Sequence, residues 1–84
     1  MKVRVTKKVS DRAVEIPIHT EYITLQDFLK FANAVESGGM AKNMIQNGQV
    51  RLNGEICTQR GRKLRAGDRV EYLHQLYAVT QEQA

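Results

Sequence analysis

The sequence has 84 residues, of which 42% are hydrophobic and 26% are charged. These values are typical of one folded globular domain and exclude a fully disordered chain. The longest apolar run, Leu76–Val79, has four residues and is too short to cross a bilayer, and no apolar stretch of the secretory type follows the charged start. A single cysteine, Cys57, cannot form an internal disulfide or a cysteine zinc cluster, so we expect a cytoplasmic protein.

Positive charge is concentrated in two segments, although the net charge is only +4. Residues 1–12 carry five basic side chains and one acidic one, and residues 60–69 carry the same numbers. The rest of the chain has three basic and seven acidic residues. Basic segments attract phosphate backbones or anionic lipid headgroups. The plain alternative is a solvated loop that only keeps a small domain soluble.

The first segments of the chain are expected to be extended. Residues 1–13 predict a basic arm or a short strand, because small apolar residues alternate with charges. Val14–Ile18 is predicted as a strand. Pro17 lies inside it and lacks an amide donor, which places the strand at the edge of a sheet.

A first helix is predicted over residues 25–34. Thr24 is a suitable N-cap, and Asp27 stands at the third helical position, where a carboxylate can bond to open amides. The apolar stripe has the spacing of one helix face and comprises Leu25, Phe28, Leu29 and Ala32. Phe31 and Val35 widen this stripe, so we expect both in the core.

A second helix is predicted from Met40 to Asn47. Ser37 is expected to cap it, and Gly48 is a natural stop signal after it. Its apolar side comprises Met40, Ala41, Met44 and Ile45. Its polar side comprises Lys42, Asn43, Gln46 and Asn47.

The pattern then changes to a period of two. Asn53-Gly54 predicts a hairpin between Val50–Leu52 and Glu55–Cys57. A strict two-residue turn sets Ile56 opposite Arg51, and a bulge is the alternative. The predicted segments that follow are a basic loop at Thr58–Lys63, a turn at Leu64–Asp68 and a core strand at Arg69–Leu73. Residues 74–84 are expected to be a C-terminal tail, with a short extra element as the alternative, so the domain proper is predicted over residues 14–73.

No residue pattern indicates an enzyme. His19 and His74 lack a nucleophile or carboxylate at a suitable spacing, and the chain has too few ligands for a metal site. The glycines match neither a P-loop nor a dinucleotide-binding fingerprint. We therefore expect no catalytic residue, no metal and no cofactor.

Two features favour nucleic-acid binding. The helix that follows Ser37 begins with free amides and a positive dipole end, and Lys42 lies one turn along. Arg60, Arg62 and Lys63 offer forked or point-charge donors to phosphate oxygens. Uncharged polar side chains on the second helix and Gln49 suit ribose or base edges. The five aromatic residues are too few for a base-stacking platform, which favours structured RNA or duplex over an unpaired strand.

The chain resembles the S-four RNA-binding domain, and in particular its small stand-alone YaaA-type members. The segments that carry the resemblance are Ile23–Lys30, Ser37–Lys42, Ile45, Gly48–Val50, Leu52–Glu55, Arg60–Leu64 and Gly67–Val70. The resemblance implies an α+β fold, the alpha-L motif, in which two helices pack on a small, mostly antiparallel sheet with a β-hairpin. It also implies RNA binding through the two helix starts, the loop between them and the hairpin. The wider family often has Arg at the positions that Gly38 and Thr24 occupy here.

Chemistry and resemblance together give one set of predicted RNA-binding residues: Thr24, Ser37, Gly38, Gly39, Lys42, Asn43, Gln46, Gln49, Arg51, Arg60, Arg62 and Lys63. We expect the basic loop and the start of the second helix to converge on one surface that binds structured RNA, such as rRNA or tRNA. A ribosomal subunit is then the expected partner, and ribosome assembly is the family-level use. The alternatives are a protein-interaction adaptor and a duplex DNA binder.

Overall fold

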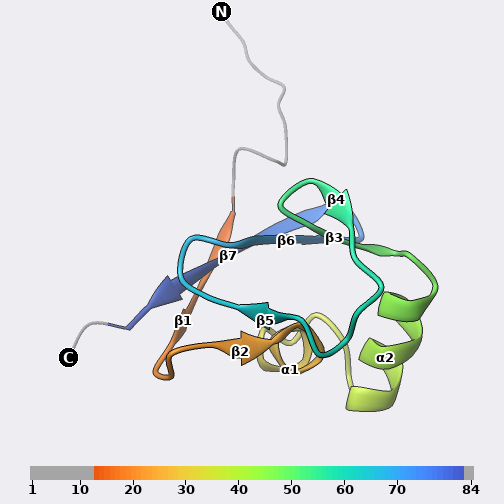
Figure 1. The fold of residues 1–84 in the computed structure, drawn as a ribbon, viewed down its shortest axis with the longest axis horizontal. Helices are drawn as coiled ribbons and strands as arrows, with labels where there is room; N and C mark the ends of the chain where they lie inside the picture. Colours follow the sequence, from red (N-terminus) through yellow and green to blue (C-terminus); the bar gives the residue numbers. More distant parts are fainter. Residues whose placement is uncertain (1–12, 83–84) are drawn as a thin grey trace, which may run out of the picture.

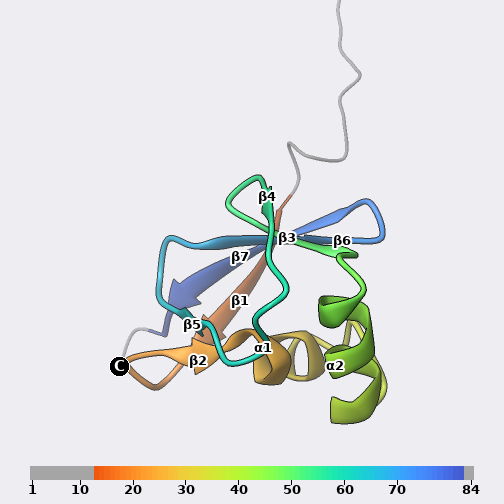
Figure 2. The ribbon, with the colours of Figure 1, turned by 45° about the vertical axis from the view of Figure 1, so that its right-hand side comes forward.

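The computed structural model describes residues 13–82, so the predicted N-terminal arm lies almost wholly outside the described residues. Two helices pack on a five-stranded sheet, and a two-stranded ribbon lies beside them (Figures 1 and 2). The elements in chain order are β1 (Val14–Ile18), β2 (Ile23–Thr24), α1 (Leu25–Phe31), α2 (Gly38–Gln46), β3 (Val50–Leu52), β4 (Glu55–Ile56), β5 (Lys63–Leu64), β6 (Arg69–Tyr72) and β7 (Gln75–Gln81). This arrangement confirms the predicted α+β fold.

The five-stranded sheet has the order β1-β7-β6-β3-β4, and β2 pairs with β5 in the ribbon. β1 pairs with β7 in parallel, whereas the other pairs are antiparallel. β1 is therefore an edge strand, as Pro17 predicted. Within residues 13–82, no helix is long and apolar enough to cross a membrane.

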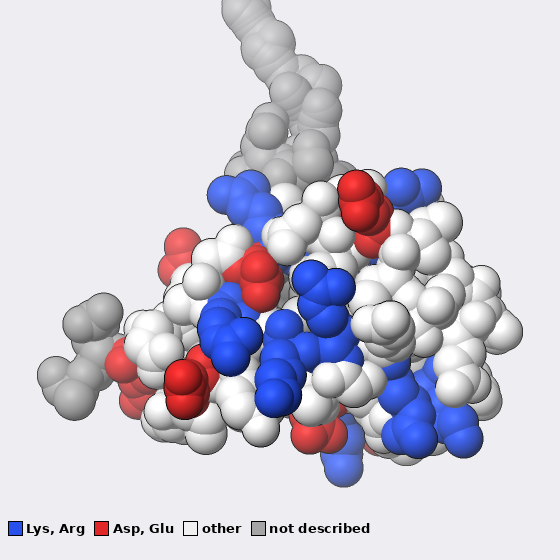
Figure 3. Space-filling view, viewed as in Figure 1, with Lys and Arg blue, Asp and Glu red and all other residues white. Residues whose placement is uncertain are grey.

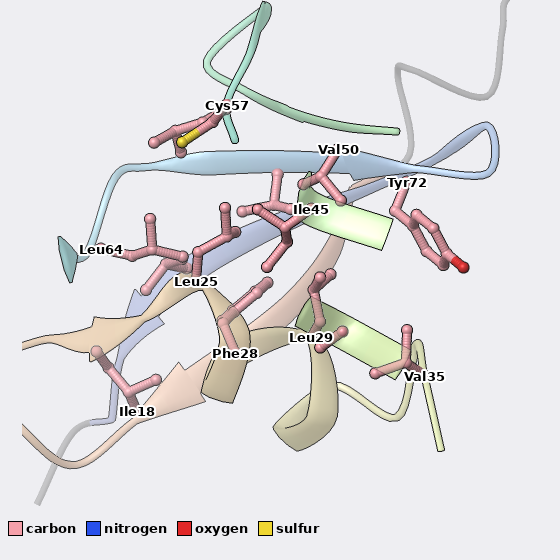
Figure 4. Packing of buried hydrophobic residues seen from close by; sticks show 14 residues of the cluster. Ile18, Leu25, Phe28, Leu29, Val35, Ile45, Val50, Cys57, Leu64 and Tyr72 are labelled. Carbon is pink, nitrogen blue, oxygen red and sulfur yellow. The ribbon is translucent and has the colours of Figure 1, made fainter. Parts of the chain in front are cut away.

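The core lies between the sheet and the helices (Figure 4). Alternate residues of β3 and β6 face inward, so Val50 and Val70 are fully buried while Arg51 between the inward positions of β3 is exposed. Phe28 from α1 packs edge-on against Tyr77 of β7, with ring centroids 6.3 Å apart. Burial of each large apolar side chain contributes roughly 1.5–3 kcal/mol. Burial of the Tyr77 side chain raises the pKa of its hydroxyl, and the electrostatic effect of Tyr72 raises it further.

Helix α1 ends earlier than predicted. Its C-cap is Ala32, and Asn33 adopts a left-handed φ of 61° that turns the chain away from the helix axis. Phe31, which we expected in the core, is 54% exposed, so that prediction is wrong. At about 100° per residue, Phe31 lies roughly 110° from the centre of the apolar stripe, too far to face the sheet. Val35 is buried as predicted, but it follows the helix.

Helix α2 begins two residues before the predicted start, because Gly38 and Gly39 form its first turn. The predicted cap is confirmed: the Ser37 side chain accepts a hydrogen bond from the Met40 amide at 3.1 Å. Ala41 and Ile45 are buried, as the apolar pattern predicted. Met40 is exposed, in contrast to its predicted place on the apolar side.

The hairpin has a strict two-residue turn and no bulge. Asn53 and Gly54 both have positive φ, 52° and 90°, as this turn requires. Arg51 and Ile56 face each other, and Ile56 is 56% exposed because both lie on the outer face of the sheet. The return strand ends at Ile56, although the Cys57 amide still donates to the Val50 carbonyl at 3.0 Å.

The prediction of a C-terminal tail over residues 74–84 is wrong. Residues 75–81 form β7, which lies between β1 and β6 and is anchored by a buried Val79. The Gln81 side chain and the Glu82 amide both donate to the Ile18 carbonyl, at 3.0 and 2.9 Å. The predicted core strand ends at Tyr72, since Leu73 and the next residue form the tight turn into β7. Similarly, Leu64 does not begin a turn but is fully buried in β5.

Candidate nucleic-acid interface

The basic loop is attached to the start of α1 by backbone hydrogen bonds. The Leu25 amide donates to the Arg62 carbonyl at 2.8 Å, and the Gln26 amide donates to the Arg60 carbonyl at 3.0 Å. The first amides of a helix have no acceptor within the helix, so the loop carbonyls satisfy two of them. Pairing of β2 with β5 continues this attachment. The basic side chains of the loop are therefore carried on a fixed backbone.

The side chain of Gln26 lies between the basic loop and the start of α2. Its oxygen accepts a hydrogen bond from the Arg60 guanidinium at 3.1 Å. Its nitrogen lies so close to Gly38 that a Cβ on that glycine would be 3.1 Å from it. Arg60 and Gly38, 22 residues apart in sequence, thus lie beside the two ends of one amide group. The structure brings the loop and the helix start to one side of the molecule, as the sequence predicted.

The start of α2 exposes polar groups on this side. The Ser37 hydroxyl caps the Met40 amide, and the Ser37 carbonyl accepts from Ala41, so the chain enters the helix in a defined direction. The amides of Gly38 and Gly39 have no acceptor within the helix, which leaves them available to an anion. The exposed side chains that follow on α2 are Lys42, Asn43 and Gln46.

The face that carries the loop has clusters of positive charge, with acidic side chains among them. Figure 3 shows blue side chains gathered over the segment between β4 and β5 and again toward the lower part of α2. Arg60, Arg62, Lys63 and Arg65 are all exposed. The Lys63 ammonium lies 4.9 Å from the centroid of the Tyr22 ring, and the Arg65 guanidinium lies 5.8 Å from it.

A shallow hollow of about 500 Å³ lies at the junction of α1 and the loop. It is lined by Thr24, Gln26, Asp27, Arg60 and Gly61. Thr24 serves as the N-cap of α1, because its hydroxyl accepts from the Asp27 amide at 3.3 Å. The Asp27 carboxylate is exposed and is the one negative group of this lining, so an anion is favoured on the Arg60 side.

Arg51 does not join this group. It lies on the outer face of the five-stranded sheet, opposite Ile56 on one neighbour and Glu71 on the other. Gln49 is exposed just before β3 and also lies near that face, where it shares a small hollow with Arg51. A separate hollow of about 480 Å³ lies between the hairpin and Arg62.

Gln26, Tyr22 and Arg65 were missed as candidate site residues. Gln26 carried no signal, because only the packing of α1 against the loop shows what its amide contacts. Tyr22 could have been found, since Ile23 is a core residue and its neighbours in an extended segment face the opposite side. Among residues 13–82, no group of three or more His, Cys, Asp or Glu side chains is placed to hold a metal ion.

The chain is similar to a known protein family and to a bacterial protein. A family model described as the S4 domain matches residues 16–80, which include all of β7 except its last residue. A protein of Bacillus subtilis (strain 168), named "Probable ribosome maturation protein RlbA", is 52% identical over 56 residues. The matched segment covers 67% of this chain and 79% of that protein.

Proposed function

The chain belongs to the S4 domain family, and from this premise we propose that it binds structured RNA without catalysing a reaction on it. The binding surface comprises the basic loop, the start of α2 and the Gln26 side chain between them. Phosphates are its main ligands, because guanidinium forks, an ammonium and open amides are all donors to phosphate oxygens. Arg51 lies outside this binding surface. It stays a predicted RNA contact at the hairpin.

One observation carries this proposal: the Gln26 side chain is hydrogen-bonded to Arg60 and lies beside Gly38. The basic loop and the positive dipole end of α2, from two distant parts of the sequence, are therefore neighbours. A phosphodiester chain offers a charge every few ångströms, so it can bind several groups on one surface at once. A loop that served only solubility would not require its guanidinium to be hydrogen-bonded to a neighbouring side chain.

The structured RNA that we propose is ribosomal. The relative from Bacillus subtilis is named for ribosome maturation, and its matched segment spans most of both chains. Asn43 and Gln46 on the exposed side of α2 are placed beside Lys42, where they can bond to ribose hydroxyls or base edges. Binding to rRNA during subunit assembly would place the protein in the cytoplasm.

A salt titration tests the proposal. We expect the protein to bind rRNA transcripts in a filter assay, with log K falling against log salt at a slope of about −3 to −4 if about four phosphates are engaged. Replacing Arg60, Arg62 and Lys63 together by Ala should lower the affinity at least tenfold and flatten the slope by about 3. Arg69→Ala is the matched control, because Arg69 is exposed outside the basic loop.

Three results would contradict this function. They are affinity that is independent of salt, affinity unchanged in the triple variant, and equal loss in the control. A DNA hairpin of the same sequence serves as competitor: equal competition would favour duplex DNA binding. A partner protein that stays bound after nuclease treatment, with no RNA affinity, would favour the adaptor function.

A further inference from the structure

An exposed aromatic ring is built into the basic surface. Tyr22 directly precedes β2, and two cations lie over its ring: the Lys63 ammonium at 4.9 Å and the Arg65 guanidinium at 5.8 Å from the ring centroid. β2 pairs with β5 so that Ile23 faces Leu64, and both of these side chains point toward the core. Side chains alternate along a strand, so the residues on either side of Ile23 and Leu64 share the outer face of the ribbon. The ring and both cations are therefore on the solvent side.

The other aromatic rings of the chain do not share this position. Phe28 and Tyr72 are buried, and Tyr77 is partly buried against Phe28. Phe31 is exposed, but it lies at the opposite end of α1 from the basic loop. Tyr22, 39% exposed, is thus the aromatic side chain that the described structure places beside the loop.

We propose that this site binds one unpaired nucleotide of the RNA. Its base stacks on the Tyr22 ring in place of the cations that lie over it, and Lys63 and Arg65 move to the phosphates on either side of that base. Aromatic stacking with flanking cations is the chemistry by which proteins hold bases that have left a helix. The inference rests on the proposed RNA binding and specifies it: the target is a helix that carries a bulge or a loop nucleotide. The few rings of the chain exclude a platform for a long single strand, but one ring suffices for one base.

Two RNA hairpins test the inference. One is a fully paired 12-base-pair stem, and the other is the same stem with a single bulged 2-aminopurine. We expect the wild-type protein to bind the bulged hairpin about tenfold more tightly, and to quench 2-aminopurine fluorescence when the base stacks. Tyr22→Leu should lower affinity for the bulged hairpin about tenfold and leave affinity for the paired stem unchanged. Tyr22→Phe should preserve both, since the ring face is retained.

Phe31→Leu is the matched control, because it removes an exposed ring outside the basic surface. Equal binding of the two hairpins by the wild type, without quenching, overturns the inference while leaving the proposed RNA binding intact. An equal loss of affinity for both hairpins in Tyr22→Leu also overturns it, because that result means the ring only stabilises the ribbon. If the wild type binds neither hairpin, the proposed function itself fails. The quenching measurement needs no variant, so it decides the question even if Tyr22→Leu does not fold.

Discussion

The guanidinium of Arg60 donates a hydrogen bond to the side-chain oxygen of Gln26 at 3.1 Å, while the backbone of Arg60 accepts one from the Gln26 amide at 3.0 Å. The two residues are thus joined twice, and the charged end of Arg60 is held at the junction of the loop and α1. An arginine that is already oriented loses less conformational entropy when it binds a phosphate.

Gln26→Ala should therefore weaken RNA binding about threefold without removing any charge, because Arg60 loses the group that orients it.

Asp27→Asn should act in the opposite direction. It removes a negative charge from the same hollow, so affinity should rise about twofold to threefold. Both values come from the filter assay at one fixed salt concentration. If both variants bind RNA more weakly than the wild type, or both bind it more tightly, the hollow does not face the RNA.

The turn at Asn53 should be sensitive to two different losses. Its side chain accepts from the Arg69 amide at 2.9 Å and donates to the Asp68 carboxylate at 3.2 Å, and its own φ is 52°. Asn53→Ala removes both hydrogen bonds and strains the backbone, so we expect a loss of about 2 kcal/mol in the free energy of unfolding. Asn53→Gly removes the bonds but accepts the positive φ, so about 1 kcal/mol is expected. Urea unfolding measures both, and equal losses would mean that the backbone is not strained.

Gly48 ends α2 with a φ of +78°, and a Cβ added there would be in ordinary contact with Ile56 at 3.6 Å. The expected cost of Gly48→Ala is therefore conformational and amounts to about 1 kcal/mol. Gly61 has no positive φ and nothing within 4 Å of an added Cβ, so Gly61→Ala should change the free energy of unfolding by less than about 0.5 kcal/mol. Similar losses in the two variants would argue against the conformational explanation.

Strand β7 should be indispensable. A chain that stops after His74 loses the strand between β1 and β6, and with it the buried Val79. We expect this chain to show no cooperative thermal transition by circular dichroism. A chain that stops after Glu82 keeps every contact of β7 described above and should melt like the full sequence. A native-like transition in the shorter chain would show that β7 is dispensable.

The free energy of unfolding should fall at alkaline pH. Burial raises the pKa of Tyr77 above its ordinary value of 10.0, so the folded state holds this proton more tightly than the unfolded state. The resulting stabilisation is complete below about pH 10 and is lost as the pH rises through the higher folded-state pKa. Tyr77→Phe should remove part of this fall as the pH rises above about 10 in thermal melts, with Tyr22→Phe as the exposed control. Identical profiles for wild type and Tyr77→Phe would contradict the assignment.

Local signals were sufficient for much of the fold. The caps at Thr24 and Ser37, and the turn at Asn53-Gly54, depend on neighbouring residues, and all three were predicted correctly. The errors concern features that depend on distant packing. β7 was missed because its apolar run, Leu76–Val79, does not alternate with polar residues as a half-buried strand does, and its place in the sheet depends on pairing with β1 and β6. Phe31 is an exception, because the helical period alone sets it about 110° from the centre of the apolar stripe, on the exposed side of α1.

The candidate site, like the fold, was predicted from sequence only where local properties determine it. The basic side chains and the glycine-led helix could be identified from residue type alone, because charge and chain reversal are local properties. Their proximity was a hypothesis that sequence alone could not establish, since it depends on which carbonyls satisfy the first amides of α1. Gln26 and Tyr22 entered the site only through contacts with residues about 40 positions away.

The parallel pairing of β1 with β7 has a consequence for how copies of the molecule meet at high concentration. The Ile18 carbonyl points toward β7, where it accepts from Glu82, and the groups of successive strand residues point to opposite sides. The nitrogen of Pro17 therefore lies on the outer edge of β1, where it has no hydrogen to donate. The other edge of the sheet, β4, is only two residues long. A foreign strand finds an incomplete ladder at either edge, so the sheet is protected from growing into an aggregate.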